Sequence, residues 1–185
     1  SLSNSMDKII LGGGIANTCI AAMGYEVGTS LVEESMLSEA KKLVDNPKII
    51  IPKEVLVSEN PDKPGRITTV DSILKNEAIF DISPSSLIDM EPFIKNAGTI
   101  LWNGPMGFFE KENYDKGTMG IANMIISSKG FSVAGGGDTI SAANKAGVLG
   151  ELGYVSTAGG AFLEFMEGKK LPALQALENK LMSGE

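Results

Sequence analysis

The feature that most constrains the fold is a pattern that occurs three times: a short apolar run, then glycines, then a segment of helical character. It is most complete in residues 131–146, FSVAGGGDTISAANKA, and it recurs around residues 12–14 and at Gly159 and Gly160. Glycines let a backbone approach a ligand closely, and the first N–H groups of the following helix lack partners within it. Because a helix N-terminus carries partial positive charge, each turn suits an anion.

Apolar runs that read as strands alternate with helical segments along the whole chain. Strands are predicted at residues 7–11, 48–51, 67–70, 78–82, 99–102, 131–134 and 154–155. Helices are predicted at residues 15–23, 33–44, 114–128, 161–166 and 171–181. A further helix is predicted to begin at Ser83 and Pro84, with Leu87, Met90 and Ile94 on one face, and another to follow Asp138 and Thr139 towards Ala146. This alternation predicts an α/β fold, Rossmann-like and doubly wound, with a mostly parallel sheet covered by helices on both faces in three layers.

Two segments carry signs of irregular structure. Pro92 is expected to kink or interrupt the helix that Ser83 and Pro84 begin. The charged, proline-rich loop at residues 60–65, NPDKPG, is expected to be disordered or tolerant of insertions.

Composition excludes several functional classes. The net charge is −7 without a basic cluster, which argues against nucleic acid or an anionic membrane surface as a partner. No apolar run approaches membrane-spanning length. The chain has no histidine, which removes histidine general-base chemistry and most zinc sites. The single cysteine, Cys19, lies in an apolar segment and is expected to be buried, and a reducing cytoplasm is the simplest setting.

The motifs leave alternatives open when they are read from the residues alone. Residues 12–14 begin like a dinucleotide fingerprint, but Asn17 stands where its third glycine belongs, so close helix–strand packing explains these glycines equally well. Asp138 either caps its helix or holds Mg²⁺ against phosphate oxygens. Asn103 and Glu110 follow the strand at residues 99–102, at the strand end where open α/β sheets bind ligands.

Five longer motifs, GGGIANT, VGTSL, LWNGPMGFFE, AGGGDT and STAGGAFLEFMEGKKLPAL, occur in this order. They make the chain resemble the C-terminal, nucleotide-binding half of phosphoglycerate kinases, those of bacteria in particular, over nearly its whole length. The resemblance implies that residues 1–185 form one domain of a two-domain glycolytic enzyme of the cytoplasm. That enzyme transfers a phosphoryl group between 1,3-bisphosphoglycerate and Mg-ADP, giving 3-phosphoglycerate and Mg-ATP.

The resemblance also implies roles for individual residues. Gly13, Gly14, Leu31, Pro105 and Phe108 would line the adenine pocket, and Glu110 would bind the ribose hydroxyls. The nucleotide phosphates would be held by Asn103, Gly136, Gly137 and Thr139, with Asp138 as the magnesium ligand. Gly137, Gly159 and Gly160 would act on the transferred phosphoryl group through helix N-termini.

Two departures from the family pattern bear on activity. Ala158 replaces a usual glycine, and the lysine-bearing GxKV segment and the amino-terminal half that binds the sugar acid are not in this sequence. We therefore expect a monomer that binds ADP or ATP with little or no turnover. The alternatives are a binding-only adenine-nucleotide module, another doubly wound nucleotide-binding enzyme, or self-association through the former interdomain face.

Overall fold

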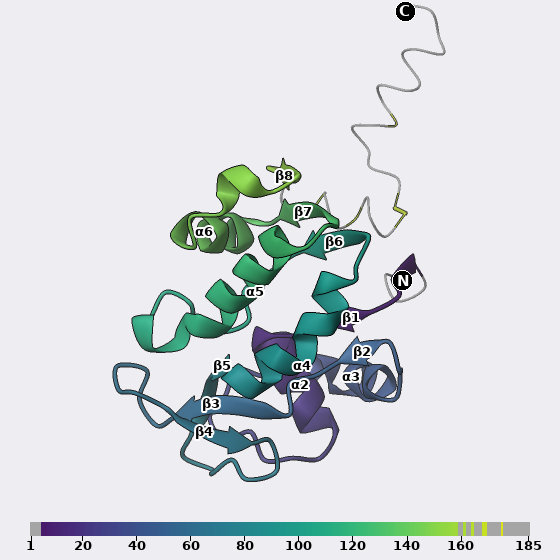
Figure 1. Ribbon diagram of the computed structural model, residues 1–185. Helices are drawn as coiled ribbons and strands as arrows, with labels where there is room; N and C mark the ends of the chain where they lie inside the picture. The colour runs from purple at the N-terminus through teal and green to yellow at the C-terminus, as the bar shows by residue number, and fades with distance from the viewer. Residues whose placement is uncertain (1–4, 159–160, 162–163, 165–167, 170–174, 176–185) are drawn as a thin grey trace, which may run out of the picture.

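The parallel strands of the molecule lie in two sheets, each covered by helices. The computed structural model describes residues 5–158 together with residues 161, 164, 168, 169 and 175. Strand β1 (Ile9–Ile10) pairs in parallel with β2 (Ile49–Ile50), and β6 (Thr99–Trp102), β7 (Phe131–Gly135) and β8 (Tyr154–Ser156) form a parallel sheet in the order β6-β7-β8. Figure 1 shows β6, β7 and β8 at one end of the molecule.

Five α-helices accompany these strands: α2 (Gly13–Ala22), α3 (Leu37–Val44), α4 (Pro84–Lys95), α5 (Lys116–Ser127) and α6 (Gly137–Lys145). Short 3-10 turns at Glu34–Met36, Glu112–Tyr114 and Leu149–Glu151 precede α3, α5 and β8. Helix α2 packs on α3, and α4 packs on α5. The predicted α/β class is therefore confirmed, whereas the helices predicted at residues 161–166 and 171–181 lie outside the described residues except at positions 161, 164 and 175.

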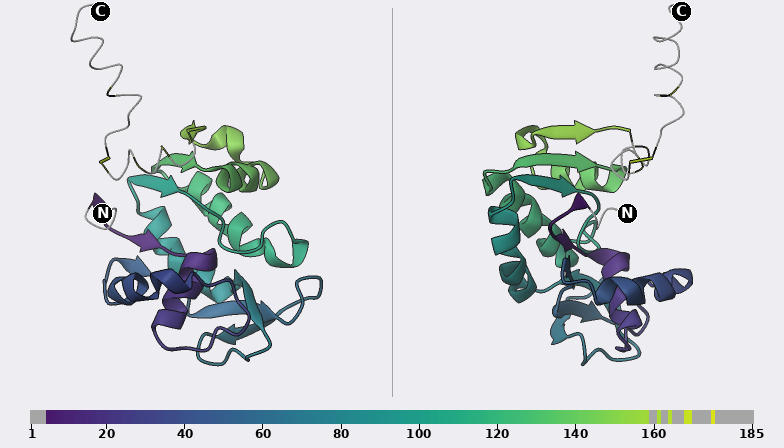
Figure 2. Two further views of the ribbon diagram at one scale, coloured as in Figure 1. Left: turned by 180° about the vertical axis from the view of Figure 1, so that it is seen from behind. Right: turned by 90° about the vertical axis from the view of Figure 1, so that its right-hand side faces the viewer.

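An antiparallel sheet was not predicted. Strands β3 (Glu54–Ser58), β4 (Arg66–Thr69) and β5 (Ala78–Ile82) pair in the order β4-β3-β5, at the opposite end of the molecule from β6 to β8 (Figures 1 and 2). The strand predicted at residues 48–51 ends at Pro52, and β3 was not predicted. The missed strand alternates, with Val55 and Val57 fully buried on one face, because only that face meets the small cluster with Ile73.

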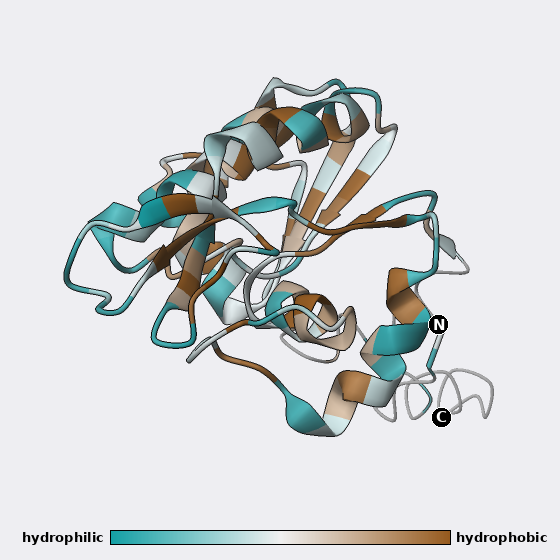
Figure 3. Ribbon diagram, turned by 90° about the horizontal axis from the view of Figure 1, so that it is seen from below, coloured by the Kyte–Doolittle hydropathy of each residue, from teal (hydrophilic) through white to brown (hydrophobic). Residues whose placement is uncertain are grey.

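The main core fills the space between the β6–β8 sheet and helices α4, α5 and α6. Its buried members include Met90, Ile94, Trp102, Ile121, Ile125, Ala134, Ala142 and Ala143. Coloured by hydropathy in Figure 3, the helices show hydrophobic and hydrophilic residues in turn along their length. Such alternation is typical of helices that bury one face and expose the other.

Helix α4 runs through Pro92 without a break, so the expected interruption was wrong. Its start agrees with the prediction: the Ser83 hydroxyl caps the helix by accepting a hydrogen bond from Ser86 N at 3.1 Å. A proline at position 92 cannot donate to the carbonyl of Ile88, four residues earlier. Ile88, which carries that carbonyl, is 66% exposed.

The loop at residues 60–65 is anchored, contrary to the expectation of disorder. The hydroxyl of the fully buried Tyr114 donates to Lys63 O at 2.5 Å, and Lys111 pairs with Asp62 at 2.6 Å. The Tyr114 ring also lies 4.9 Å, centroid to centroid, from that of Phe80. These partners are remote in sequence, so local composition gave no sign of them.

Candidate functional site

The carboxyl ends of three parallel strands supply the residues of the candidate site. Strand β1 leads to Gly12, β6 to Asn103 and β7 to Gly136. Gly13 N donates to Met106 O at 2.9 Å, which joins the end of β1 to the loop that follows β6. The first two of the three glycine-rich turns thus both contact this loop, the first at Met106 and the second at Asn103. The third, at Gly159 and Gly160, lies outside the described residues.

Gly13 and Gly14 let α2 pack closely against the loop after β6 and against Leu31. A Cβ at Gly13 would lie 3.5 Å from Pro105 O, and one at Gly14 would lie 3.3 Å from Leu31 Cδ2. Gly13 also has φ +55°, a conformation that other residues rarely adopt. Leu31 is 77% exposed and so presents its side chain outward beside these glycines. Four of the five residues predicted for the adenine pocket thus lie together.

The segment that carries Leu31 is held by two polar side chains of α2. Asn17 donates to Leu31 O at 3.3 Å, and the Thr18 hydroxyl accepts from Glu33 N at 3.0 Å. The sequence analysis treated Asn17 only as a departure from a dinucleotide fingerprint and did not consider Thr18. The signal that could have identified both residues is their position as adjacent polar residues in an otherwise apolar helix.

The loop after β6 carries the fifth pocket residue, Phe108, and the predicted ribose ligand, Glu110. Phe108 N donates to Phe80 O at 2.7 Å, and its ring lies 6.2 Å from that of Phe80. The Phe108 side chain remains partly exposed, and Glu110 is exposed. Both are therefore accessible to a ligand, while the backbone that carries them is fixed to β5.

The β7–α6 turn forms the second part of the site. Gly136 has φ +96° and ψ 144°, and it is the N-cap of α6, with no capping side chain. Asn103 Nδ2 donates to Gly135 O at 2.6 Å, which places the Asn103 side chain against this turn. Asp138 is exposed in the first turn of α6. Since it makes no capping bond, the reading of Asp138 as a helix cap was wrong.

Thr139 is buried and its side chain binds the backbone of the loop after β6. Its hydroxyl accepts a hydrogen bond from Gly104 N at 2.7 Å, and the residue is 1% exposed. The lone pair that this bond uses is therefore not available to a ligand, although the Thr139 backbone lies in the first turn of α6. Gly136, Thr139 and Asn103 are in contact, as a Cβ at Gly136 would lie within 3.5 Å of both side chains.

A buried carboxylate supports the loop from the side of β5. Asp81 is 1% exposed and accepts hydrogen bonds from Gly117 N at 2.8 Å and from Ile82 N at 2.9 Å. Burial raises the pKa of Asp81 to about 7, the nearby Asp115 acts in the same direction, and the two N–H groups oppose the shift. Nothing in the sequence reading singled out this residue.

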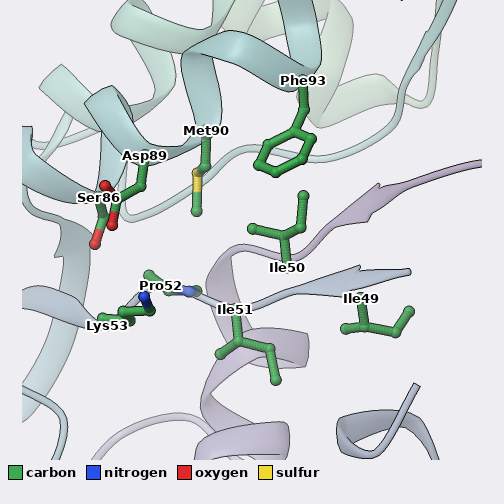
Figure 4. Close-up of a pocket in the computed structure, with 9 residues that line it drawn as sticks. All are labelled: Ile49, Ile50, Ile51, Pro52, Lys53, Ser86, Asp89, Met90 and Phe93. Carbon is green, nitrogen blue, oxygen red and sulfur yellow. The ribbon is translucent and has the colours of Figure 1, made fainter. Parts of the chain in front are cut away.

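A separate hollow lies between β2 and α4. It encloses about 390 Å³ between residues 49–53 and the α4 side chains of Ser86, Asp89, Met90 and Phe93 (Figure 4). None of the residues predicted for nucleotide binding lines this hollow. Within the described part of the chain, no group of three or more acidic or cysteine side chains gathers as a metal site.

The sequence as a whole matches a known protein family. The family model described as phosphoglycerate kinase matches residues 1–169. The chain belongs to the phosphoglycerate kinase family. This assignment excludes the alternative of an unrelated doubly wound nucleotide-binding enzyme. Where the chain is described, no helix has the length and apolarity to cross a membrane.

Individual phosphoglycerate kinases show the same similarity. The phosphoglycerate kinase of Vibrio campbellii is 48% identical over 180 residues, which cover 96% of this chain and 47% of the relative. The structure of phosphoglycerate kinase from Coxiella burnetii matches with a TM-score of 0.88 at 40% identity, over 94% of this chain and 48% of the other. The enzyme from Pyrococcus horikoshii matches with a TM-score of 0.81 at 30% identity, over 95% and 46%. The chain thus spans about half the length of these phosphoglycerate kinases.

Proposed function

We propose that this chain binds ADP or ATP with Mg²⁺, as the C-terminal, nucleotide-binding half of a phosphoglycerate kinase. The observation that carries the proposal is the path of the loop at residues 103–110. Its Pro105 lies beside Gly13 of α2, while Asn103 and Gly104 contact the N-terminal turn of α6. One continuous segment therefore borders both exposed apolar side chains suited to a base, Leu31 and Phe108, and a helix N-terminus suited to phosphates.

The roles follow from the chemistry of each part. The purine would lie against Leu31, Pro105 and Phe108, of which Leu31 and Phe108 are exposed. The Glu110 carboxylate would accept hydrogen bonds from the ribose hydroxyls. The phosphates would meet the N–H groups at Gly137 and the first turn of α6, with the Asn103 amide beside them.

Asp138 fits a magnesium ligand on chemical grounds. It is an exposed carboxylate beside the turn proposed for phosphate, and Mg²⁺ usually binds one or two carboxylates together with substrate phosphates. The ion would neutralise charge on the phosphates during transfer. Asp138 would then orient the nucleotide by holding the ion at the N-terminus of α6.

The reaction proposed for the intact protein is phosphoryl transfer between 1,3-bisphosphoglycerate and ADP, within glycolysis and the cytoplasm. The nucleophile is a phosphate oxygen and the leaving group a carboxylate, so a chain without histidine is sufficient. Gly137, Gly159 and Gly160 would direct helix N-termini at the transferred group. Because the sugar acid would bind to a half outside this chain, we propose that the chain alone binds nucleotide with little or no turnover.

Calorimetric titration with ADP, with and without Mg²⁺, tests this function. The wild-type chain is expected to bind saturably and more tightly with Mg²⁺, and Asp138→Ala is expected to bind equally with and without it. Glu39→Ala is the matched control, because Glu39 is also an exposed acidic residue in the first turn of a helix, α3. It should keep the magnesium dependence of the wild type.

Two results would contradict the proposal. Absence of ADP binding by a chain whose circular dichroism shows it folded would reject the nucleotide site as assigned. A coupled assay that finds more than a trace of full-length turnover, after removal of host enzyme, would reject the proposal that this chain alone has little or no activity. Size exclusion at two concentrations checks the proposed monomer against self-association.

A further inference from the structure

The side chain of Lys145 connects helix α6 to the loop that carries Phe108 and Glu110. Lys145 is in the last turn of α6, at the opposite end of the helix from the turn proposed for phosphate. Its Nζ donates to Phe109 O at 2.5 Å and lies 2.9 Å from Asp115 Oδ2. Phe109 stands directly between Phe108 and Glu110, so the bond is made to the backbone that carries the proposed base and ribose ligands.

Helix α6 therefore holds this loop at two places. Near the helix N-terminus the Thr139 hydroxyl accepts from Gly104 N, and near the C-terminus Lys145 donates to Phe109 O. Six residues of helix separate the two side chains, a rise of about 9 Å. Because a helix of this length is stiff, it fixes the spacing between the phosphate end and the loop that would hold the nucleoside.

The environment of Lys145 favours an ordered contact over a loose surface pair. The Lys145 side chain is 37% exposed and that of Asp115 is 16% exposed, and Phe109 is 4% exposed. A charged donor on a carbonyl in such a setting makes a stronger bond than two solvated charges do. Other hydrogen bonds of the loop, from Phe108 N to Phe80 O and from Met106 N to Thr118 Oγ1, connect it to β5 and α5. Asn103 connects the start of the loop to the β7–α6 turn, whereas Lys145 connects its Phe109 end to α6.

We propose that Lys145 is a positioning residue for the nucleotide. It contacts no part of the ligand itself; it sets Phe108 and Glu110 at the distance from the α6 N-terminus that lets base, ribose and phosphates bind together. The inference rests on the proposed function and deepens it. It predicts that loss of Lys145 weakens ADP binding although the pocket, Asp138 and the α6 N-terminus are all retained.

The test compares Lys145→Met with Lys145→Arg by calorimetric titration with Mg-ADP. The methionine retains most of the aliphatic length and removes the charge and donors, and we expect it to weaken binding about tenfold. The arginine restores a charged donor and should bind within about threefold of the wild type. Lys95→Met is the matched control, since it removes a similar helical ion pair, with Glu91 on α4, and should stay within twofold.

Tryptophan emission gives a second readout that a general loss of stability does not mimic. Trp102 is the only tryptophan, and its indole N–H donates to Gly104 O at 2.9 Å, at the start of the loop. We expect Lys145→Met, but not Lys95→Met, to change the emission of the folded, nucleotide-free chain.

The outcomes separate the inference from the function beneath it. Wild-type affinity in Lys145→Met, or the same loss in Lys145→Met and Lys95→Met, would overturn the role of Lys145 while the nucleotide site stands. Failure of the wild-type chain to bind Mg-ADP would reject the proposed function, and the inference with it.

Discussion

Asp81 and Gly117 are joined by a hydrogen bond of 2.8 Å, from the backbone N–H at the start of α5 to a buried carboxylate that also lies beside the loop at residues 103–110. Glycine is required at this contact, because a Cβ at position 117 would lie 2.2 Å from Asp81 Oδ1. The same oxygen would lie 2.5 Å from a Cβ at Gly107, within the loop. One buried side chain thus sets how closely β5, the loop and α5 approach one another.

The first prediction concerns the dependence of stability on pH. Burial raises the pKa of Asp81 to about 7 in the folded chain, above its ordinary value of 3.8. Between these values the native state holds a proton that the unfolded chain has lost, so the free energy of unfolding should fall as pH rises from 5 to 7, by at most about 1.4 kcal/mol per pH unit. Above the folded pKa this dependence should end. Urea unfolding followed by circular dichroism measures it.

Asp81→Asn is the control for that dependence. The amide can accept only one of the two backbone N–H groups, so the variant should be less stable by about 1–3 kcal/mol but nearly insensitive to pH in this range. No histidine is present to titrate between pH 5 and 7. A slope that persists unchanged in Asp81→Asn would show that Asp81 is not its source.

The second prediction concerns packing around the loop. A Cβ at Gly107 would lie 2.4 Å from Phe80 O, so Gly107→Ala must displace backbone and should destabilise the chain by about 2 kcal/mol or more. Gly98→Ala is the matched control, since a Cβ there meets nothing within 4 Å. Thermal unfolding of both variants tests this, and equal midpoints would be incompatible with the close approach of the loop to β5.

The third prediction separates stability from binding at adjacent glycines. Gly136→Ala should cost about 1–3 kcal/mol, because its φ of +96° is strained for any residue with a Cβ. Gly137→Ala lies within α6 and meets nothing within 4 Å, so it should fold at least as stably as the wild type. Its added methyl group would lie in open space at the helix N-terminus where the phosphates are proposed to bind, and we expect ADP affinity to fall about tenfold. Unfolding curves measure the stability of both variants, and calorimetry measures their affinity for ADP. Unchanged affinity in Gly137→Ala would count against phosphate binding at this turn.

The fourth prediction concerns Cys19, which is 1% exposed in α2. Burial raises the pKa of the Cys19 thiol, so the reactive thiolate is scarce as well as inaccessible. A thiol reagent should modify the native chain slowly and the urea-unfolded chain at once. If ADP binds beside α2, it should slow the native reaction further, and rapid labelling of the folded chain would contradict the burial of α2.

Local sequence predicted the bounds of an element correctly where turn residues flank that element. Strands β5 and β6 have the predicted bounds, because glycine, proline or asparagine follows or precedes their apolar runs within a few residues. The site was partly predictable for the same reason: glycines follow β1 and β7, and both of these turns contact the loop after β6. Cys19 is buried, as expected.

Long-range contacts were beyond the reach of such reasoning. Asp81 meets Gly117, and Lys145 meets Phe109, across more than thirty residues, and neither pair is encoded in spacing or composition. The anchoring of the loop at residues 60–65 by Tyr114 is of the same kind. The division of the parallel strands between two sheets was also not predictable, since periodicity identifies strands but not their neighbours.

The antiparallel sheet has a consequence for the order in which the chain folds. Strands β3, β4 and β5 are consecutive in sequence, so their pairing closes shorter loops than the pairing of β1 with β2 or of β6 with β7. Contacts between neighbouring segments cost less loop-closure entropy and form sooner. We therefore expect residues 54–82 to provide an early folding nucleus, and the edge that would receive the nucleotide, assembled from segments far apart along the chain, to be completed last.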